Sequence, residues 1–202
     1  VYKRQEQVLP EKKNLEEVEQ ARTGSIEVVL TDGKAGTDKR NVKIRCQKVS
    51  EIVQGEYVLL KSYKDAGVDL NAIENSNDLK NAAEQLLSKA EESTNTNVTD
   101  ANGTVTFKNL EVGVYLISAE DTERYDTVEP SLIAVPIWSD SEGEMQYDVV
   151  IEPKHTEKPD KEENTAPQTN LEENTWRYAG LAGICVVGAV VCIIRMRKSC
   201  LL

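Results

Sequence analysis

Histidine and cysteine are scarce in this sequence, and their scarcity removes several kinds of site. The 202 residues contain one histidine, His155, and four cysteines. Cys185 and Cys192 lie in a long apolar run and Cys200 lies in the tail behind it, so Cys46 is the one cysteine of the part that we expect to fold. That part cannot form an internal disulfide or a Cys/His metal cluster, and a lone histidine leaves little room for a nucleophile–histidine pair. We therefore expect no enzyme activity, no metal site and no cofactor.

Positive charge is also in short supply. Lysine and arginine together number 24, against 35 for aspartate and glutamate, which gives a formal net charge of −11. Nucleic acids and anionic membrane surfaces attract basic proteins. The composition therefore argues against either partner and is typical of an acidic extracellular domain.

Long apolar runs are missing from the sequence except for one near the C-terminus. Tyr178–Ile194 is a run of seventeen residues without a charge, at the short end of what crosses a bilayer as a helix. Trp176 precedes the run at the level of the membrane interface, where aromatic rings are enriched, and basic residues follow the run. The positive-inside rule then predicts a transmembrane helix over 176–195, a basic cytoplasmic tail over 196–202 and an extracellular chain before them.

The pentapeptide Ala166-Pro167-Gln168-Thr169-Asn170 precedes this run. A pentapeptide, an apolar helix and a basic tail in this order resemble the sorting signal of Gram-positive surface proteins. In that family a sortase, a cysteine transpeptidase, cuts after the threonine of an LPxTG-like motif and transfers the acyl group to an amine of the cell wall or of another protein. Pro167, Gln168 and Thr169 match the motif. Ala166 replaces leucine, and Asn170 replaces glycine, as in the NPQTN signal of class B sortases. A plain membrane anchor without cleavage stays open as the alternative.

The N-terminal residues are polar and carry no apolar signal-peptide core. The chain begins at Val1 without a methionine, so we expect that its N-terminus is truncated or artefactual. Residues 1–23 are mostly charged or polar. We expect them to form a leader outside the hydrophobic core.

The central segment 24–154 changes to the alternating pattern of short strands. Apolar residues recur at every second position over 26–30 and 42–46, as half-buried strands require. Further short strands are predicted over 104–107, 112–118, 132–138 and 147–151, and 56–60 extends the second hairpin. One helix interrupts them, with a cap at Ser76 or Asn77 and apolar residues at Leu79, Ala82, Ala83, Leu86, Leu87 and Ala90. The pattern predicts a mainly β fold, a Greek-key β-sandwich with one inserted helix. Residues 155–175, rich in Glu, Lys, Pro, Asn and Thr, predict a disordered linker.

A second resemblance rests on the stretch from Asp100 to Ile117. Asp100-Ala101-Asn102-Gly103, Phe107, Leu110 and Gly113-Val114-Tyr115-Leu116-Ile117 are similar to the DxNGxxxFxxLxxGxYLI pattern of collagen-adhesin B-type domains. Together with the closing segment Tyr147–Lys154, the stretch resembles the N-terminal domain of Gram-positive pilin subunits. The resemblance implies a prealbumin-like sandwich at the cell surface, anchored to the cell wall and active in adhesion.

The pilin resemblance raises the question of an internal Lys–Asn isopeptide bond. Related domains place the lysine in the first strand, where this chain has none. The catalytic acid would fall near Ala119, but Glu120 comes one residue later and would face the other side of its strand. The last strand has no asparagine. We therefore predict that the bond is absent.

The family's pilin motif WxxxVxVYPK provides the lysine that accepts the acyl group of another subunit. Lys154 aligns with that lysine, and Val149, Ile151 and Pro153 fit the motif, whereas Met145 replaces Trp and Glu152 replaces Tyr. Lys154 is therefore either an acceptor or an ordinary solvated lysine. We expect a cell-wall-anchored surface protein or a minor or basal pilin subunit. Its partners would be a sortase, peptidoglycan or another pilin, and a ligand on a host or neighbouring cell. The alternative is a membrane-tethered adhesin or binding module that no sortase cleaves.

Overall fold

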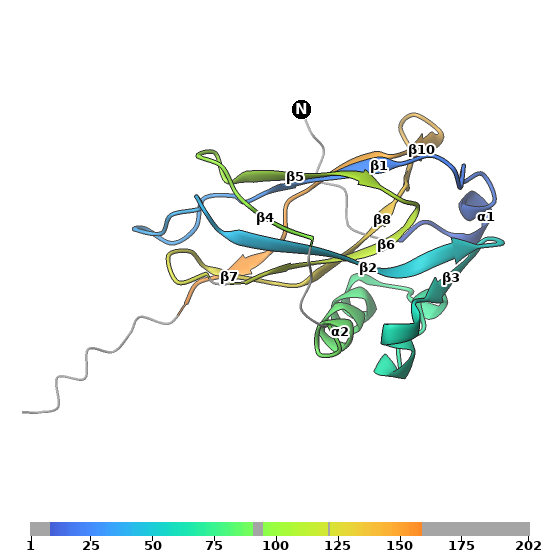
Figure 1. Cartoon of the computed structure of the whole chain (residues 1–202), viewed down its shortest axis with the longest axis horizontal. Coiled ribbons are helices and arrows are strands. Elements are labelled where there is room, and N and C mark those ends of the chain that lie inside the picture. The colour runs from blue at the N-terminus through green and yellow to red at the C-terminus, as the bar shows by residue number, and fades with distance from the viewer. Residues whose placement is uncertain (1–8, 91–94, 121, 159–202) are drawn as a thin grey trace, which may run out of the picture. The chain divides into compact units, whose positions relative to one another are not determined.

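The computed structural model describes residues 9–90, 95–120 and 122–158, and the compact unit ends at Lys158 (Figure 1). Its helices are α1 (Lys12–Leu15) and α2 (Ser76–Leu87), with 3₁₀ turns η1 (Lys61–Ala66) and η2 (Leu70–Ala72). Its strands are β1 (Gly24–Val29), β2 (Lys43–Val53), β3 (Glu56–Leu59), β4 (Thr96–Val98), β5 (Thr104–Leu110), β6 (Gly113–Ala119), β7 (Thr127–Val128), β8 (Ser131–Val135), β9 (Ile137–Ser139), β10 (Glu144–Gln146), β11 (Asp148–Ile151) and β12 (His155–Thr156). The prediction of a mainly β chain is confirmed.

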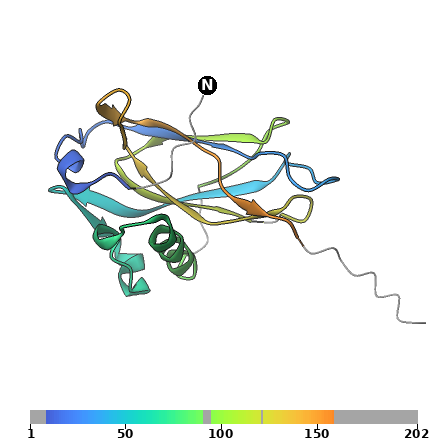
Figure 2. The same ribbon diagram turned by 180° about the vertical axis from the view of Figure 1, so that it is seen from behind.

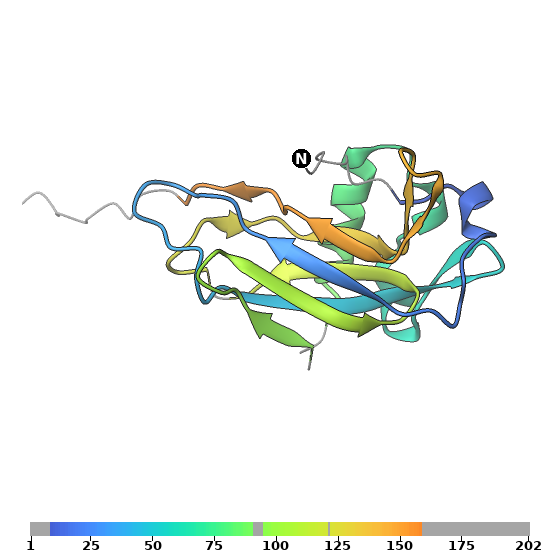
Figure 3. The same ribbon diagram turned by 90° about the horizontal axis from the view of Figure 1, so that it is seen from above.

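Two sheets face each other in this domain (Figure 3). One has the strand order β3-β2-β6-β8, with β4 also paired to β2. The other has the order β11-β1-β5, in which β1 and β11 run parallel and β1 and β5 antiparallel. Short pairs β9–β10 and β7–β12 lie beside them.

The inner core fills the space between the two sheets. Alternating residues of the predicted strands point into it, including Ile26 and Val28 of β1, Ile44 of β2 and Phe107 of β5, all at most 4% exposed. A period of two along each strand places every second side chain on the same face. The alternation in the sequence therefore predicted this core correctly.

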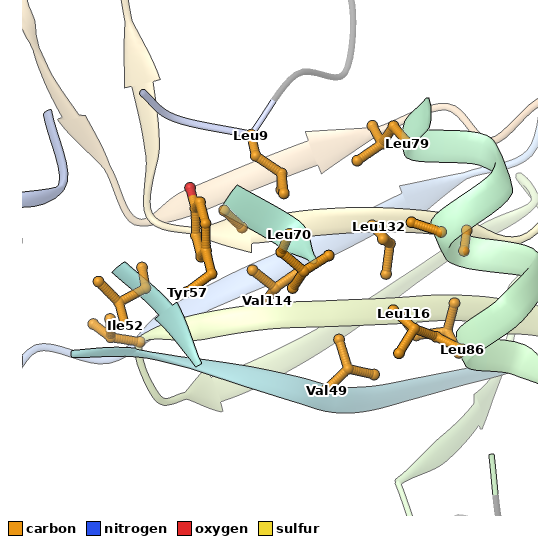
Figure 4. Close-up of a cluster of buried hydrophobic side chains, with 14 of the residues drawn as sticks. Leu9, Val49, Ile52, Tyr57, Leu70, Leu79, Leu86, Val114, Leu116 and Leu132 are labelled. Carbon is orange, nitrogen blue, oxygen red and sulfur yellow. The ribbon is translucent and has the colours of Figure 1, made fainter. Parts of the chain in front are cut away.

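A second core lies on the outer face of the larger sheet, under helix α2 (Figure 4). Leu79 and Leu86 of the helix share this core with Val114 and Leu116 of β6. Since β6 is covered on both faces, it is buried at every position except its last. The helix begins one residue earlier than expected, because the side chain of Asn75 caps it by accepting from the backbone N–H groups of residues 77 and 78.

The prediction that residues 1–23 form a leader outside the core is wrong for the part that the structure describes. Leu9 and Leu15 are 8% and 3% exposed and belong to the outer core. The Tyr57 hydroxyl donates to the Pro10 carbonyl oxygen at 2.9 Å, and the Glu19 N–H donates to the Tyr147 hydroxyl at 2.8 Å. Two leucines among charged residues give little periodicity, so only their tertiary contacts mark them as core.

The predicted strand over 132–138 is two strands that belong to different sheets. β8 pairs with β6, whereas β9 pairs with β10. Pro136 separates them, and a proline has no N–H to donate to a sheet ladder. The apolar run therefore continues across the break although the hydrogen-bond pairing does not.

The folded domain also extends past its predicted end at Lys154. His155 and Thr156 form β12, which pairs with β7 rather than belonging to a disordered linker (Figure 2). Among the described residues, none of the helices has the length and apolarity to span a bilayer. The expected linker beyond Lys158, the pentapeptide, the transmembrane helix over 176–195 and the tail over 196–202 lie outside the described residues.

Candidate functional site at the C-terminal end of the domain

The segment aligned with the pilin motif alternates strictly between core and solvent. Met145, Tyr147, Val149 and Ile151 are between 2% and 9% exposed and point into the protein. Pro153 is buried as well, and the alternate residues at 146, 148, 150, 152 and 154 are exposed or half-buried. The motif's apolar positions are thus core positions, and its lysine position lies on the outside.

Lys154 holds its place through its backbone while its side chain lies in solvent. Its carbonyl oxygen accepts from the Glu129 N–H at 2.8 Å, just before β12 begins. Its side chain is exposed, and no hydrogen bond or ion pair joins its ammonium group to another described residue. A surface amine on an anchored backbone can serve as an acyl acceptor, and it is equally what an ordinary surface lysine looks like.

Next to Lys154, the side chain of His155 turns inward and joins two residues from distant parts of the chain. Its Nδ1 lies 2.8 Å from Oδ2 of Asp126, and its Nε2 lies 2.8 Å from Oγ1 of Thr31. The Asp126 side chain is 2% exposed and that of His155 is 17% exposed. Thr31, His155 and Asp126 therefore form a hydrogen-bonded row, which we call the Thr31 cluster.

Several local features hold the Thr31 cluster in place. The Tyr125 hydroxyl donates to the Thr31 carbonyl oxygen at 2.6 Å, and its ring lies 5.3 Å from the His155 ring. The Lys34 N–H donates to Asp126 Oδ2 at 3.2 Å. Gly33 permits this approach, since a Cβ there would stand 2.7 Å from Asp126 Oδ2. The bend after β1 and the segment before β7 are thereby fastened to β12.

The structure corrects the inference drawn from the single histidine. One histidine is enough for a hydroxyl–histidine–carboxylate row, and this chain contains one. Sequence analysis missed the cluster because its members form no local motif. Thr31 lies 124 positions before His155, and Asp126 lies 29 positions before it. Only the tertiary fold brings them together.

Glu120 has surroundings unlike those of an isopeptide catalyst. Its carboxylate pairs with Lys43 and Arg45 of β2. The hydrogen bond from Lys43, followed by that from Arg45, lowers the pKa of Glu120, which keeps the carboxylate ionised. Strand β1 contains no lysine, and its partner strand β11 contains no asparagine. These positions agree with the predicted absence of the bond, which stays a prediction.

A polar hollow of about 470 Å³ lies beside β2, away from the Thr31 cluster. Its lining includes Tyr63, Asn95, Asn109, Tyr115 and the ion pair between Lys48 and Glu111, whose atoms are 2.9 Å apart. Cys46 also borders it, but burial raises the pKa of that thiol to about 12, so it is not a reactive thiolate. The hollow is thus lined mainly by amide, hydroxyl and charged groups.

The comparisons with known proteins give only distant structural similarity. No family model matches the sequence, and no curated protein matches it. Among solved structures, the chain is similar to the major pilin SpaD of Corynebacterium diphtheriae, with 23% identity and a TM-score of 0.45 over 69% of this chain and 31% of that one. It is also similar to the major pilin SpaA of the same species, with 20% identity and a TM-score of 0.39 over 66% of this chain and 30% of that one.

A shorter protein matches over nearly its whole length. The SpaB basal pilin of Lactobacillus rhamnosus GG has 14% identity and a TM-score of 0.41, over 65% of this chain and 97% of that one. The chain spans less than a third of the two Corynebacterium pilins. Similarity at this level carries no argument about function, which must come from the residues of this chain.

Proposed function

We propose that this chain is a cell-wall-anchored surface protein, a minor or basal pilin subunit, and the substrate of a sortase that cleaves after Thr169. The observation that carries the proposal is the order of three C-terminal parts, the pentapeptide 166–170, the apolar run 178–194 and the basic tail. The apolar run and the tail would hold the chain in the membrane with its domain outside. Pro167 favours an extended segment that an enzyme cleft can bind.

The position of the folded domain is consistent with this role. The domain continues to Lys158, and eleven positions separate Lys158 from Thr169 (169 − 158). Such a segment spans at most about 40 Å when fully extended. The sortase would therefore act close to the domain, and the Thr169 carbonyl would pass to an amine of peptidoglycan or of another pilin.

The spacing of Lys154 and Thr169 argues for a single attachment rather than a polymer. Fifteen positions separate them (169 − 154), a span of at most about 55 Å. A polymer joined at these two residues would be a thin thread with domains attached to its side, because no folded domain lies between the links. We therefore propose that the protein is attached once, at the wall or at one end of a pilus, with Lys154 at most a single acceptor.

Digestion of the cell wall tests the proposal. Wall-degrading enzymes should release a protein whose C-terminal peptide ends at Thr169 and carries a peptidoglycan fragment. The alternative is a membrane-tethered adhesin or binding module, for which the polar hollow beside Lys48 and Glu111 would be the place to look for a ligand. Recovery of the chain only with detergent, still containing Cys200, would support that alternative instead.

A further inference from the structure

We propose that Thr31 is an activated nucleophile, a site at which the protein accepts an acyl group from an ester or thioester. Its Oγ1 lies 2.8 Å from Nε2 of His155, and Nδ1 of the same ring lies 2.8 Å from Oδ2 of Asp126. A nucleophile within hydrogen-bond reach of a base that a third group orients is the arrangement that activates hydroxyl groups in acyl transfer. This inference goes beyond the proposed function and does not depend on it.

The surroundings of the row determine which atoms carry the protons. An ionised carboxylate only accepts hydrogen bonds, so in the neutral form of His155 the Asp126 carboxylate selects the tautomer that has its hydrogen on Nδ1. Nε2 then has a free lone pair, and the Thr31 hydroxyl donates to it. Oδ2 of Asp126 also accepts from the backbone N–H of Lys34 at 3.2 Å. The other carboxylate oxygen, Oδ1, is buried and makes no hydrogen bond with any described residue. The carboxylate can therefore stabilise an imidazolium ion as it forms.

Access and rigidity also fit an acyl-accepting site. Thr31 is half-buried and the His155 side chain keeps 17% of its surface exposed, whereas Asp126 is enclosed. The Thr31 and His155 side of the row therefore touches solvent, and the Asp126 side is closed. The Tyr125 hydroxyl, which donates to the carbonyl oxygen of Thr31, fixes the backbone that carries the nucleophile.

The transfer consists of two balanced steps. Oγ1 of Thr31 attacks the acyl carbonyl carbon while Nε2 of His155 takes the hydroxyl proton. The bond from that carbon to its leaving oxygen or sulfur then breaks, and the leaving group takes the proton from Nε2 and departs as an alcohol or thiol. The product is an ester of Thr31, and no atom is oxidised or reduced.

Acylation of the full chain by p-nitrophenyl acetate tests the inference. After exposure to the reagent, peptide mass mapping should find one acetyl group on the peptide that contains Thr31. Hydroxylamine should remove this group, because it cleaves esters but leaves acetylated lysines intact. Thr156, an exposed hydroxyl of β12, is the internal control. General-base catalysis should acylate Thr31 about 100-fold faster than Thr156.

Three variants separate nucleophilic activation from a structural role. His155→Ala and Asp126→Asn should each reduce acylation of Thr31 to the rate of Thr156, while Thr31→Ser should stay reactive. Circular dichroism should show all three folded at the assay temperature, and Asp126→Asn keeps the side-chain volume if His155→Ala does not fold. Equal rates at Thr31 and Thr156 in the unmodified chain would overturn the inference, and so would unchanged acylation of Thr31 in folded Asp126→Asn. The cluster would then be only a fastening of β12.

Discussion

The Nδ1 atom of His155 lies 2.8 Å from Oδ2 of Asp126, a residue that is almost completely buried. This contact fastens the segment after the last sandwich strand to the body of the domain. Together with the pairing of β12 to β7, it places the end of the folded part beyond Lys154. Lys154, the position of the pilin-motif lysine, is therefore followed by the ordered strand β12 rather than directly by a linker.

The contact predicts a measurable contribution of His155 to stability. His155→Ala would remove hydrogen bonds to Asp126 and Thr31 and leave a buried carboxylate with fewer donors. We expect the free energy of unfolding to fall by about 2–3 kcal/mol. Urea denaturation followed by circular dichroism measures it. Thr156→Ala, the exposed neighbour in β12, should change it by less than about 0.5 kcal/mol, and equal effects of the two variants would contradict the role given to His155.

The N-terminal segment should also contribute to stability, since Leu15 is 3% exposed in the outer core. Leu15→Ala would open a cavity there and should lower the free energy of unfolding by about 2–4 kcal/mol. The exposed Lys13 of the same short helix is the matched control, and Lys13→Ala should be close to neutral. Denaturant midpoints of the two variants that coincide would show that residues 9–22 are not part of the domain.

Anchoring to the wall should depend on Thr169. In cells that carry the matching sortase, Thr169→Ala should abolish covalent attachment and leave the protein in the membrane fraction, because the acyl group to be transferred belongs to that residue. Immunoblots of wall digests and membrane fractions distinguish the two locations. Wall attachment that persists in this variant would exclude cleavage after Thr169.

Lys154 should be dispensable for anchoring. Lys154→Arg keeps the charge but removes the primary amine that accepts acyl groups, so wall attachment should be unchanged. Denaturing gels of wall digests should show no ladder of high-mass multimers with either chain. A ladder that disappears in Lys154→Arg would identify a polymerising backbone pilin and refute the single attachment.

The domain should contain no Lys–Asn cross-link. Peptides from the strands β1 and β11 should therefore appear separately after digestion, each at the mass that its sequence predicts. A linked pair of peptides that is lighter by one ammonia would show the bond. Without such a covalent brace, the domain should unfold with an ordinary free energy of about 5–15 kcal/mol.

Local patterns in the sequence predicted much of the fold. Alternation marked β1 through Ile26 and Val28, and an i, i+3, i+4 pattern marked helix α2 through Leu79 and Leu86. Both patterns can be read from the sequence because one face of each element is buried, so apolar residues recur along it at the period of a strand or a helix. Leu9 and Leu15 were not predicted as core residues, because two buried residues in a short irregular segment form no periodic pattern.

The sequence by itself indicated the alternating strands, helix α2 and the exposed position of Lys154, and it alone carries the pentapeptide that contains Thr169. All of these depend on residues that are neighbours along the chain. The tertiary structure decided the pairing of the strands, the burial of the N-terminal segment and the meeting of Thr31, Asp126 and His155. Periodic patterns in a sequence show which residues share a face of one strand or helix. They do not show which residues of different segments form hydrogen bonds, and the contacts of Thr31 and Asp126 with His155 are of this kind.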